Sequence, residues 1–177
     1  SKPVRRAELH SVVTTLLGGK PAEIGAETGD LKAATILRGM VLLVDDDAGN
    51  RKIAGAMLKK LGLEPDVVND GQAAVEAAAE KDYDAILMDV QMPVMDGLEA
   101  TRLIREFPNE HRHVPIIALT ANAMPEDREM CLTAGMDDYL AKPVRRARLR
   151  DVLHRWLSES EKAKAETLDP SETILRL

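Results

Sequence analysis

The stretch Tyr83–Asp89 constrains the fold of this chain most, because it is a short apolar segment that ends in a single carboxylate. Its centre, Ile86–Met88, is apolar on both alternating faces, which is typical of a strand that helices cover on both sides. The turn Val90–Gly97 follows at once, and Pro93 within it cannot donate to a sheet ladder. Open α/β sheets place their sites at the carboxyl ends of strands, so the sequence predicts that Asp89 belongs to a site.

The strand pattern occurs four more times, and segments with helical periodicity separate the strands. Five strands that alternate with five helices predict an α/β fold with a doubly wound, five-stranded parallel sheet. The predicted strands are Val41–Val44, Asp66–Val68, Ile86–Asp89, Pro115–Leu119 and Asp138–Ala141, and the predicted helices are Asn50–Leu61, Ala73–Glu80, Leu98–Phe107, Pro125–Ala134 and one helix after Pro143. The predicted buried face of the first helix comprises Ile53, Ala54, Met57, Leu58 and Leu61.

An internal repeat indicates the domain organisation. Lys2–Ala7 has the same sequence as Lys142–Ala147, and apolar residues at helical spacing follow both copies. We interpret residues 1–17 as the C-terminal helix of an upstream, related unit, although an unrelated surface helix at 5–17 would leave the same pattern. Residues 18–39 are rich in glycine and predict a linker, which is either a passive tether or inhibitory. The main domain is predicted at 40–158 and a polar tail at 159–177.

The composition argues against several classes of protein. A net charge of −6 over 177 residues argues against direct binding to nucleic acid. The single cysteine cannot form an internal disulfide and fits a reducing compartment. The sequence contains neither an apolar run long enough to cross a bilayer nor a signal-peptide pattern. We therefore expect a cytoplasmic location without direct membrane contact.

Polar side chains converge at the ends of the predicted strands. Asp45 and Asp46 follow the first strand, Asp89 ends the third, Thr120 ends the fourth, and Lys142 follows the fifth. Parallel strands bring all of these to one edge of the sheet. Two carboxylates ~4 Å apart repel by about 4 kcal/mol at an effective dielectric constant of about 20, so this cluster favours a bound cation. Oxygen ligands favour Mg²⁺ or Mn²⁺, and the whole set suits phosphoryl transfer to a carboxylate nucleophile.

Four motifs follow one another at domain-scale spacing. They are Val44-Asp45-Asp46, Met88-Asp89 with Met92–Gly97, Ala118–Ala123, and Ala134–Pro143. With these motifs, residues 40–157 resemble the receiver domain of the two-component response-regulator family, especially receivers fused to hybrid histidine kinases. The resemblance implies the flavodoxin-like receiver fold, here preceded by the N-terminal helix and linker.

The resemblance also implies a role for each site residue. Asp89 would be the phosphoacceptor, which takes a phosphoryl group from a phosphohistidine. Asp46, Asp89 and the backbone carbonyl of Gln91 would bind Mg²⁺ directly, and Asp45 would hold it directly or through water. Lys142 would pair with the phosphoryl group, and its peptide bond to Pro143 would be cis.

The resemblance further implies a conformational switch. Thr120 would move to bond the phosphoryl oxygen, and Tyr139 would turn into the space that Thr120 leaves. Asp47 departs from the commonest family pattern, which has Asn at this position. We expect Asp47 to cap the following helix, and an effect on metal affinity is the alternative.

The expected partners follow from the same resemblance. They are a phosphohistidine donor, such as the dimerisation domain of a kinase, a histidine-phosphotransfer protein, and the upstream receiver-like domain of a parent hybrid histidine kinase. A homodimer is also left open. The chain itself would then be a self-catalysing phosphoacceptor rather than a turnover enzyme.

Two other functions remain as alternatives. The first is a regulatory docking or dimerisation module whose chemistry has been lost. The second is a Mg²⁺-dependent phosphatase of the haloacid-dehalogenase type, which also uses an Asp nucleophile. Members of that family carry the motif D-x-D-x-T after their first strand, whereas Asp45–Gly49 in this sequence lacks the threonine.

Overall fold

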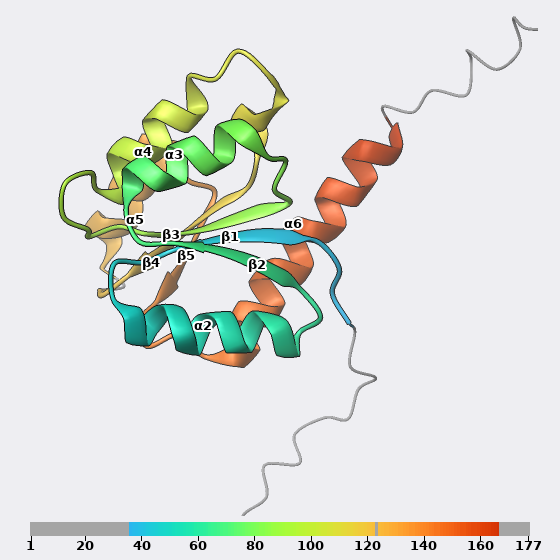
Figure 1. The fold of residues 1–177 in the computed structure, drawn as a ribbon, viewed down its shortest axis with the longest axis horizontal. Helices are drawn as coiled ribbons and strands as arrows, with labels where there is room; N and C mark the ends of the chain where they lie inside the picture. Colours follow the sequence, from blue (N-terminus) through green and yellow to red (C-terminus); the bar gives the residue numbers. More distant parts are fainter. Residues whose placement is uncertain (1–35, 123, 167–177) are drawn as a thin grey trace, which may run out of the picture. The chain divides into compact units, whose positions relative to one another are not determined.

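The computed structural model describes residues 36–122 and 124–166, with side chains described as far as residue 159. Five strands and five α-helices alternate in these ranges (Figure 1), as the sequence predicts. The predicted helix 1–17, residues 18–35 of the predicted linker and the end of the tail, 167–177, lie outside the described residues. The elements are β1 (Met40–Val44), α2 (Ala48–Lys60), β2 (Glu64–Val68), α3 (Gly71–Glu80), β3 (Ala85–Asp89), α4 (Gly97–Arg105), the 3-10 helix η1 (Glu110–His113), β4 (Ile116–Thr120), α5 (Pro125–Ala134), β5 (Asp138–Ala141) and α6 (Arg146–Glu166).

The strands form one parallel sheet in the order β2-β1-β3-β4-β5. The chain runs outward from β1 to β2, then crosses to β3 on the other side of β1. This reversal of strand order is the place where open α/β sheets form a crevice at their carboxyl edge. The fold therefore puts the ends of β1 and β3 side by side at such a crevice.

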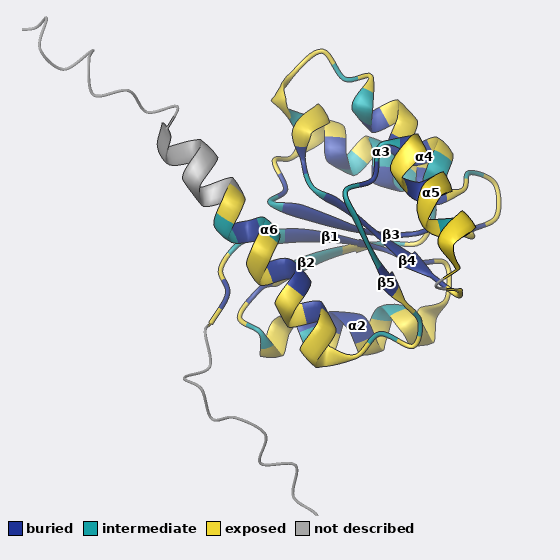
Figure 2. Ribbon diagram, turned by 180° about the vertical axis from the view of Figure 1, so that it is seen from behind, coloured by how far each residue is buried: buried dark blue, intermediate teal, exposed yellow. Residues whose placement is uncertain are grey.

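Two layers of helices bury the two faces of the sheet. Side chains of α2 and α6, such as Leu58 and Leu153, pack against one face. Side chains of α3, α4 and α5, such as Ala74, Ile104 and Cys131, pack against the other. Figure 2 shows the central strands as buried and the outer surfaces of the helices as exposed. All five residues of β3 are buried, as predicted for a strand covered on both faces.

The predicted buried face of α2 is wrong at one position, Ile53, whose side chain is 59 % exposed. The helix turns Ala54, Gly55 and Leu58 toward the sheet, and Ile53 lies outside that stripe. The helix also begins two residues earlier than predicted, because the Asp47 carboxylate accepts a hydrogen bond from the Asn50 N–H and caps it. Asp47 thus has the capping role that the sequence predicts.

Packing of the domain begins before Met40. Leu37 is buried between α2 and α6, and its N–H donates to the Leu61 carbonyl. Gly62 has a φ of +90°, and a Cβ there would collide with Ile36 and with the Leu37 carbonyl. At the other end of the domain, α6 continues to Glu166, so the first part of the predicted polar tail is helical.

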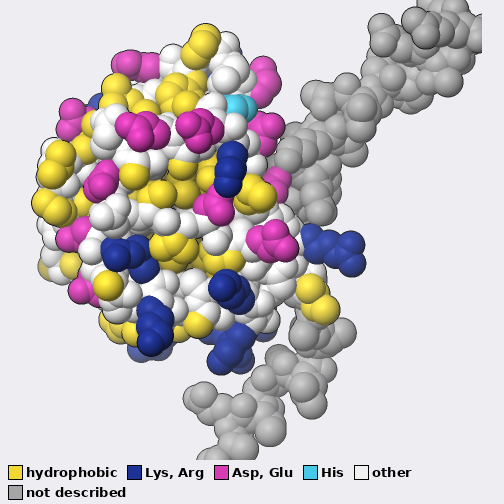
Figure 3. All heavy atoms as spheres, in the orientation of Figure 1, with side chains coloured by type: hydrophobic (Ala, Val, Ile, Leu, Met, Phe, Trp, Pro, Cys, Tyr) yellow, Lys and Arg dark blue, Asp and Glu magenta, His cyan; other side chains and the backbone are white. Residues whose placement is uncertain are grey.

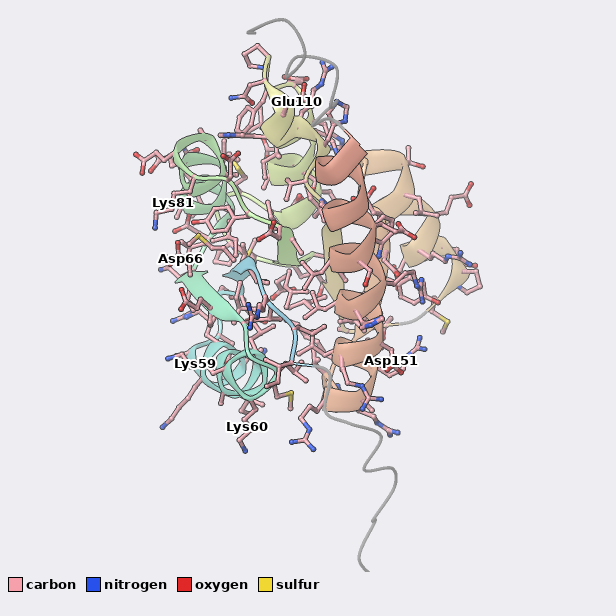
Figure 4. The ribbon with its side chains drawn as sticks, turned by 90° about the vertical axis from the view of Figure 1, so that its right-hand side faces the viewer. Lys59, Lys60, Asp66, Lys81, Glu110 and Asp151 are labelled. Atoms are coloured by element: carbon pink, nitrogen blue, oxygen red, sulfur yellow. The ribbon has the colours of Figure 1, made fainter. Side chains whose placement is uncertain are left out.

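The outer edge of β2 carries charged and polar side chains. Asp66 accepts hydrogen bonds of 2.8 Å from both Lys81 and Tyr83, and Figure 4 shows Lys81 and Asp66 on the same side of the domain. Pro65 removes one backbone donor from this strand. Such features disfavour pairing of the edge with another chain. Among the described residues, none of the helices combines the length and apolar character that a membrane span requires.

Candidate phosphoacceptor and metal site

The predicted site residues from β1, β3 and β5 meet at the carboxyl edge of the sheet. The Lys142 Nζ lies 2.6 Å from Asp89 Oδ2 and 2.8 Å from Asp45 Oδ2. Asp89 is the last residue of β3, and Asp45 and Lys142 are the first residues after β1 and β5. Because strand positions are fixed by the ladder, the ammonium is held between the two carboxylates by the sheet itself.

The three carboxylates form a cluster suited to a hard cation. Single oxygens of Asp45, Asp46 and Asp89 all lie within 4.8 Å of one another. Asp45 and Asp89 are buried, whereas Asp46 is exposed. Oxygen donors with one side open to water match the preference of Mg²⁺ for carboxylates and retained waters. The donor set therefore fits the predicted divalent cation.

Asp45 is already bonded by the protein through both of its oxygens. Its Oδ1 accepts from the Asp47 N–H at 2.9 Å and from the Asn50 amide at 3.4 Å, and its Oδ2 accepts from Lys142. Asp89 accepts from the Gln91 N–H at 3.2 Å and from Lys142. Among the described residues, Asp45 thus accepts three hydrogen bonds and Asp89 two, and each still offers one oxygen to the cluster.

Burial and charge act against each other at this site. Burial raises the pKa of the Asp89 carboxyl above its usual value, the Lys142 ammonium opposes that shift, and neighbouring Asp45 adds to it. Burial alone would lower the pKa of Lys142, but its hydrogen bonds to Asp45 and Asp89 outweigh burial and raise it. Lys142 therefore stays protonated at neutral pH as the counterion of the two buried carboxylates.

Thr120 and Tyr139 lie on the neighbouring strands β4 and β5. The Thr120 hydroxyl donates to the Asn122 carbonyl at 2.7 Å and accepts from the Asn122 N–H at 3.2 Å. Tyr139 pairs with Ala118 in the ladder, and the Arg128 guanidinium lies over its ring, 5.6 Å from the ring centre. The hydroxyl of Thr120 is thus held in the loop after β4, and the ring of Tyr139 is held from α5.

The turn after Asp89 is compact. The Gly97 N–H donates to the Val90 carbonyl, and a Cβ on Gly97 would collide with the Asp89 carbonyl oxygen. Only glycine permits this close return of the chain past the end of β3. Val94 at the tip is 98 % exposed and has a φ of +72°, which is unusual for a β-branched residue. The Lys142–Pro143 bond is cis, as the resemblance implies.

Sequence reasoning missed Arg51 as a residue of the site. Its guanidinium donates to the carbonyl of Asp45 at 2.7 Å and to the carbonyl of Asp46 at 2.8 Å. The available signal was a cation within one helical turn of the acidic loop. A side chain of this length can equally point into solvent, so the sequence alone does not decide between the two arrangements.

Comparison with known proteins agrees with this geometry. Residues 41–154 match the profile described as the response regulator receiver domain. The chain is 38 % identical over 155 residues to the signal transduction histidine-protein kinase BarA of Escherichia coli, covering 88 % of this chain and 16 % of that protein. It is 37 % identical to the sensor protein GacS of Pseudomonas syringae, covering 88 % of this chain and 17 % of that protein. The chain thus spans only a small part of these curated relatives.

Solved structures are similar over the same region. A receiver domain of a sensor histidine kinase from Pseudomonas aeruginosa, with a magnesium ion in its active site cleft, is 52 % identical, with a TM-score of 0.64 and coverage of 69 % of this chain and 99 % of that chain. The receiver domain of the yeast regulator Ssk1, in a complex with the histidine phosphotransfer protein Ypd1, is 34 % identical. Its TM-score is 0.61, and the match covers 66 % of this chain and 87 % of that chain.

Proposed function

Because the chain belongs to the response regulator receiver family, we propose that Asp89 accepts a phosphoryl group from a phosphohistidine in two-component phosphorelay signalling. The observation that carries this assignment is the environment of Asp89. Its side chain is 6 % exposed, lies beside two further aspartates, and is bonded to the Lys142 ammonium at 2.6 Å. For a carboxylate to act as nucleophile toward a phosphoryl group, the neighbouring aspartates must bind a cation, and a fixed positive charge must pair with the incoming phosphoryl group.

The reaction is a transfer between two nucleophiles. An Asp89 carboxylate oxygen attacks the phosphorus, the P–N bond of the phosphohistidine breaks, and its electron pair returns to the imidazole ring. Asp46, Asp89 and the Gln91 carbonyl would hold Mg²⁺ or Mn²⁺, with Asp45 binding directly or through water, and the cation would neutralise charge on the phosphoryl oxygens. Lys142 then exchanges its bond to the Asp89 carboxylate for one to the transferred group.

The switch residues act after the transfer. Thr120 gives up its bond to the Asn122 carbonyl and donates to a phosphoryl oxygen. Tyr139 turns into the space that Thr120 vacates and leaves the Arg128 guanidinium. The two arrangements differ in a few hydrogen bonds and one cation–π contact, so phosphorylation shifts their populations.

The partners of the site are proteins that carry a phosphohistidine. Support comes from the histidine-kinase relatives and from the phosphotransfer protein bound to a similar receiver. The donor is therefore a kinase dimerisation domain or a histidine-phosphotransfer protein, and the parent chain is a hybrid histidine kinase. In that arrangement residues 1–17 end an upstream receiver-like domain, 18–39 link it to the receiver at 40–158, and 159–177 form a polar tail. The location is cytoplasmic, and self-association into a homodimer is a further arrangement to test.

Incubation with Mg²⁺ and acetyl phosphate, followed by intact mass measurement, tests the assignment. The native protein should gain one phosphoryl adduct, and Asp89→Asn should gain none, because the amide is not a nucleophile. Asp47→Asn is the matched control, since Asn caps a helix as well as Asp does, and it should keep the adduct.

Three outcomes would contradict parts of the proposal. No adduct on the native protein would overturn the receiver chemistry, and an adduct that persists in Asp89→Asn would overturn the nucleophile. Sustained turnover of unrelated phosphomonoesters would support the phosphatase instead. Analytical ultracentrifugation of the phosphorylated and unmodified protein tests the homodimer.

A further inference from the structure

Arg51 is the one charged side chain among the described residues that bonds the backbone carbonyls of both Asp45 and Asp46 in the acidic loop between β1 and α2. A single guanidinium nitrogen, Nη1, donates to the Asp45 carbonyl at 2.7 Å and to the Asp46 carbonyl at 2.8 Å. Arg51 itself is partly buried and lies in the first turn of α2. The contact therefore ties the start of the helix to the end of the strand.

These two hydrogen bonds fix the direction of the Asp46 peptide. Successive carbonyls of an extended strand point to opposite sides, so two that converge on one nitrogen require the chain to turn between them. The Asp45 carboxylate also accepts a hydrogen bond from the Asp47 N–H. In the described part of the chain, the Asp46 carboxylate has no such bond. The direction in which the Asp46 side chain leaves the loop thus depends on its backbone, which Arg51 holds.

Arg51 also completes the charge balance of the site. Four carboxylates, Asp45, Asp46, Asp47 and Asp89, stand within the β1–α2 loop and at the end of β3. Lys142 and Arg51 supply two positive charges, which leaves a formal charge of −2 that one divalent cation neutralises. Because the guanidinium occupies the carbonyls of Asp45 and Asp46, it leaves the carboxylates of this loop as the ligands for the cation.

We propose that Arg51 is a positioning residue for the divalent cation: by bonding the carbonyls of Asp45 and Asp46, it orients the Asp46 carboxylate toward the metal. This role rests on the proposed function of the site. It predicts that the reach of the guanidinium matters and that positive charge near the loop is insufficient, because the ammonium of a lysine at the same position ends one bond short of Nη1.

Calorimetric titration of the unphosphorylated full chain with Mg²⁺ measures this role directly. Arg51→Gln should weaken Mg²⁺ binding about 10-fold, as is typical when a residue that supports a metal ligand is lost. Arg51→Lys keeps the charge, but its side chain is one bond shorter and brings its donors less close to the two carbonyls, so its affinity should lie between those of Arg51→Gln and the native protein. Lys52→Gln is the matched control, because it removes the same charge from the adjacent, exposed position and should bind within about twofold of the native protein.

The outcomes separate this role from the proposed function. Arg51→Gln equal to Lys52→Gln would overturn the role of Arg51 while leaving the metal site intact. Arg51→Lys equal to the native protein would show that charge alone acts and would overturn the positioning role. If the native protein and Asp46→Asn bind Mg²⁺ equally weakly, the metal site itself fails and the role fails with it. Urea unfolding of each variant shows whether it is folded, and Arg51→Lys serves as the test if Arg51→Gln does not fold.

Discussion

At the scale of single residues, Lys142 is the positive charge that lies between two buried carboxylates of the site. Its ammonium is bonded to the carboxylates of Asp45 and Asp89, whose side chains are only 2 % and 6 % exposed. Removing one partner of a buried ion pair is more damaging than replacing the whole pair, because the remaining charge is left without compensation. Here two such carboxylates would be left.

Replacement of Lys142 should therefore destabilise the domain, and Mg²⁺ should reverse part of the loss. Lys142→Gln is expected to lower the free energy of unfolding by about 3 kcal/mol in the absence of divalent cations. Saturating Mg²⁺ should restore a measurable fraction, because it binds the folded state and neutralises the same carboxylates. Urea unfolding with and without Mg²⁺ measures both effects.

Lys60 provides the control for this experiment. Figure 4 shows Lys60 at the end of α2, where its side chain points away from the domain. Lys60→Gln should change the free energy of unfolding by less than about 0.5 kcal/mol. Equal effects of the two replacements would contradict the role of Lys142 as counterion.

At the same scale, the sequence predicts the central residues of the site and misses their support. Asp45, Asp89 and Lys142 could be placed together because each stands at the end of a parallel strand, and the ladder leaves little freedom there. Arg51 could not be placed, because its long side chain has many rotamers and its partners are backbone carbonyls. Backbone acceptors are present at every position and leave no mark in the sequence.

At the scale of elements, α2 shows why helix positions are predicted more reliably than helix faces. The spacing of apolar residues predicts a helix at 50–61, and the structure has a helix at 48–60. The apolar stripe of this helix is wider than the surface that contacts the sheet, so one edge of the stripe faces solvent. Ile53 is that edge, and Leu58 lies at the centre of the contact with no exposed surface. The sheet decides which part of the stripe it covers.

Alanine replacement in α2 should separate these two positions. Leu58→Ala should lower the free energy of unfolding by about 3 kcal/mol, because it leaves a cavity in a fully packed core. Ile53→Ala should change it by less than about 1 kcal/mol, because the side chain is already largely in water. Thermal or urea unfolding measures the difference, and a larger loss for Ile53→Ala would show that its side chain is covered in solution.

At the scale of the whole molecule, Leu37 packs into the core although the sequence places it in the predicted linker at 18–39. The glycines at 18, 19, 25, 29 and 39 suggest a linker up to residue 39. Leu37 nevertheless packs into the core with residues of α2 and α6, and Gly62 lies close against Ile36. A single apolar residue in a glycine-rich stretch gives too weak a periodic signal to place.

Two truncated chains should locate this boundary. A chain that begins at Ile36 keeps the buried Leu37 side chain and its N–H bond to the Leu61 carbonyl, whereas a chain that begins at Met40 loses both. The shorter chain should be less stable by about 2 kcal/mol, the value expected for one buried leucine side chain. Matched urea unfolding curves test this, and equal midpoints would place the boundary at Met40.

Charge is also distributed unevenly over the molecule. On the face shown in Figure 3, basic side chains gather mainly on the side of α2, and acidic ones are more frequent on the side of α3. The net charge of −6 therefore does not describe the local field that a partner would meet. The composition could exclude classes of partner, but the surface on which a partner docks depends on the fold.

The separation of the site residues along the chain has a consequence for biosynthesis. Lys142 follows Asp89 by 53 positions and comes from β5, after which α6 still has to cover the sheet. A nascent chain that has not reached residue 142 carries Asp45 and Asp89 without the ammonium that lies between them, and the two carboxylates repel one another. Because domains generally fold as units during synthesis, we expect the site to be complete only after the last strand and its helix have left the ribosome.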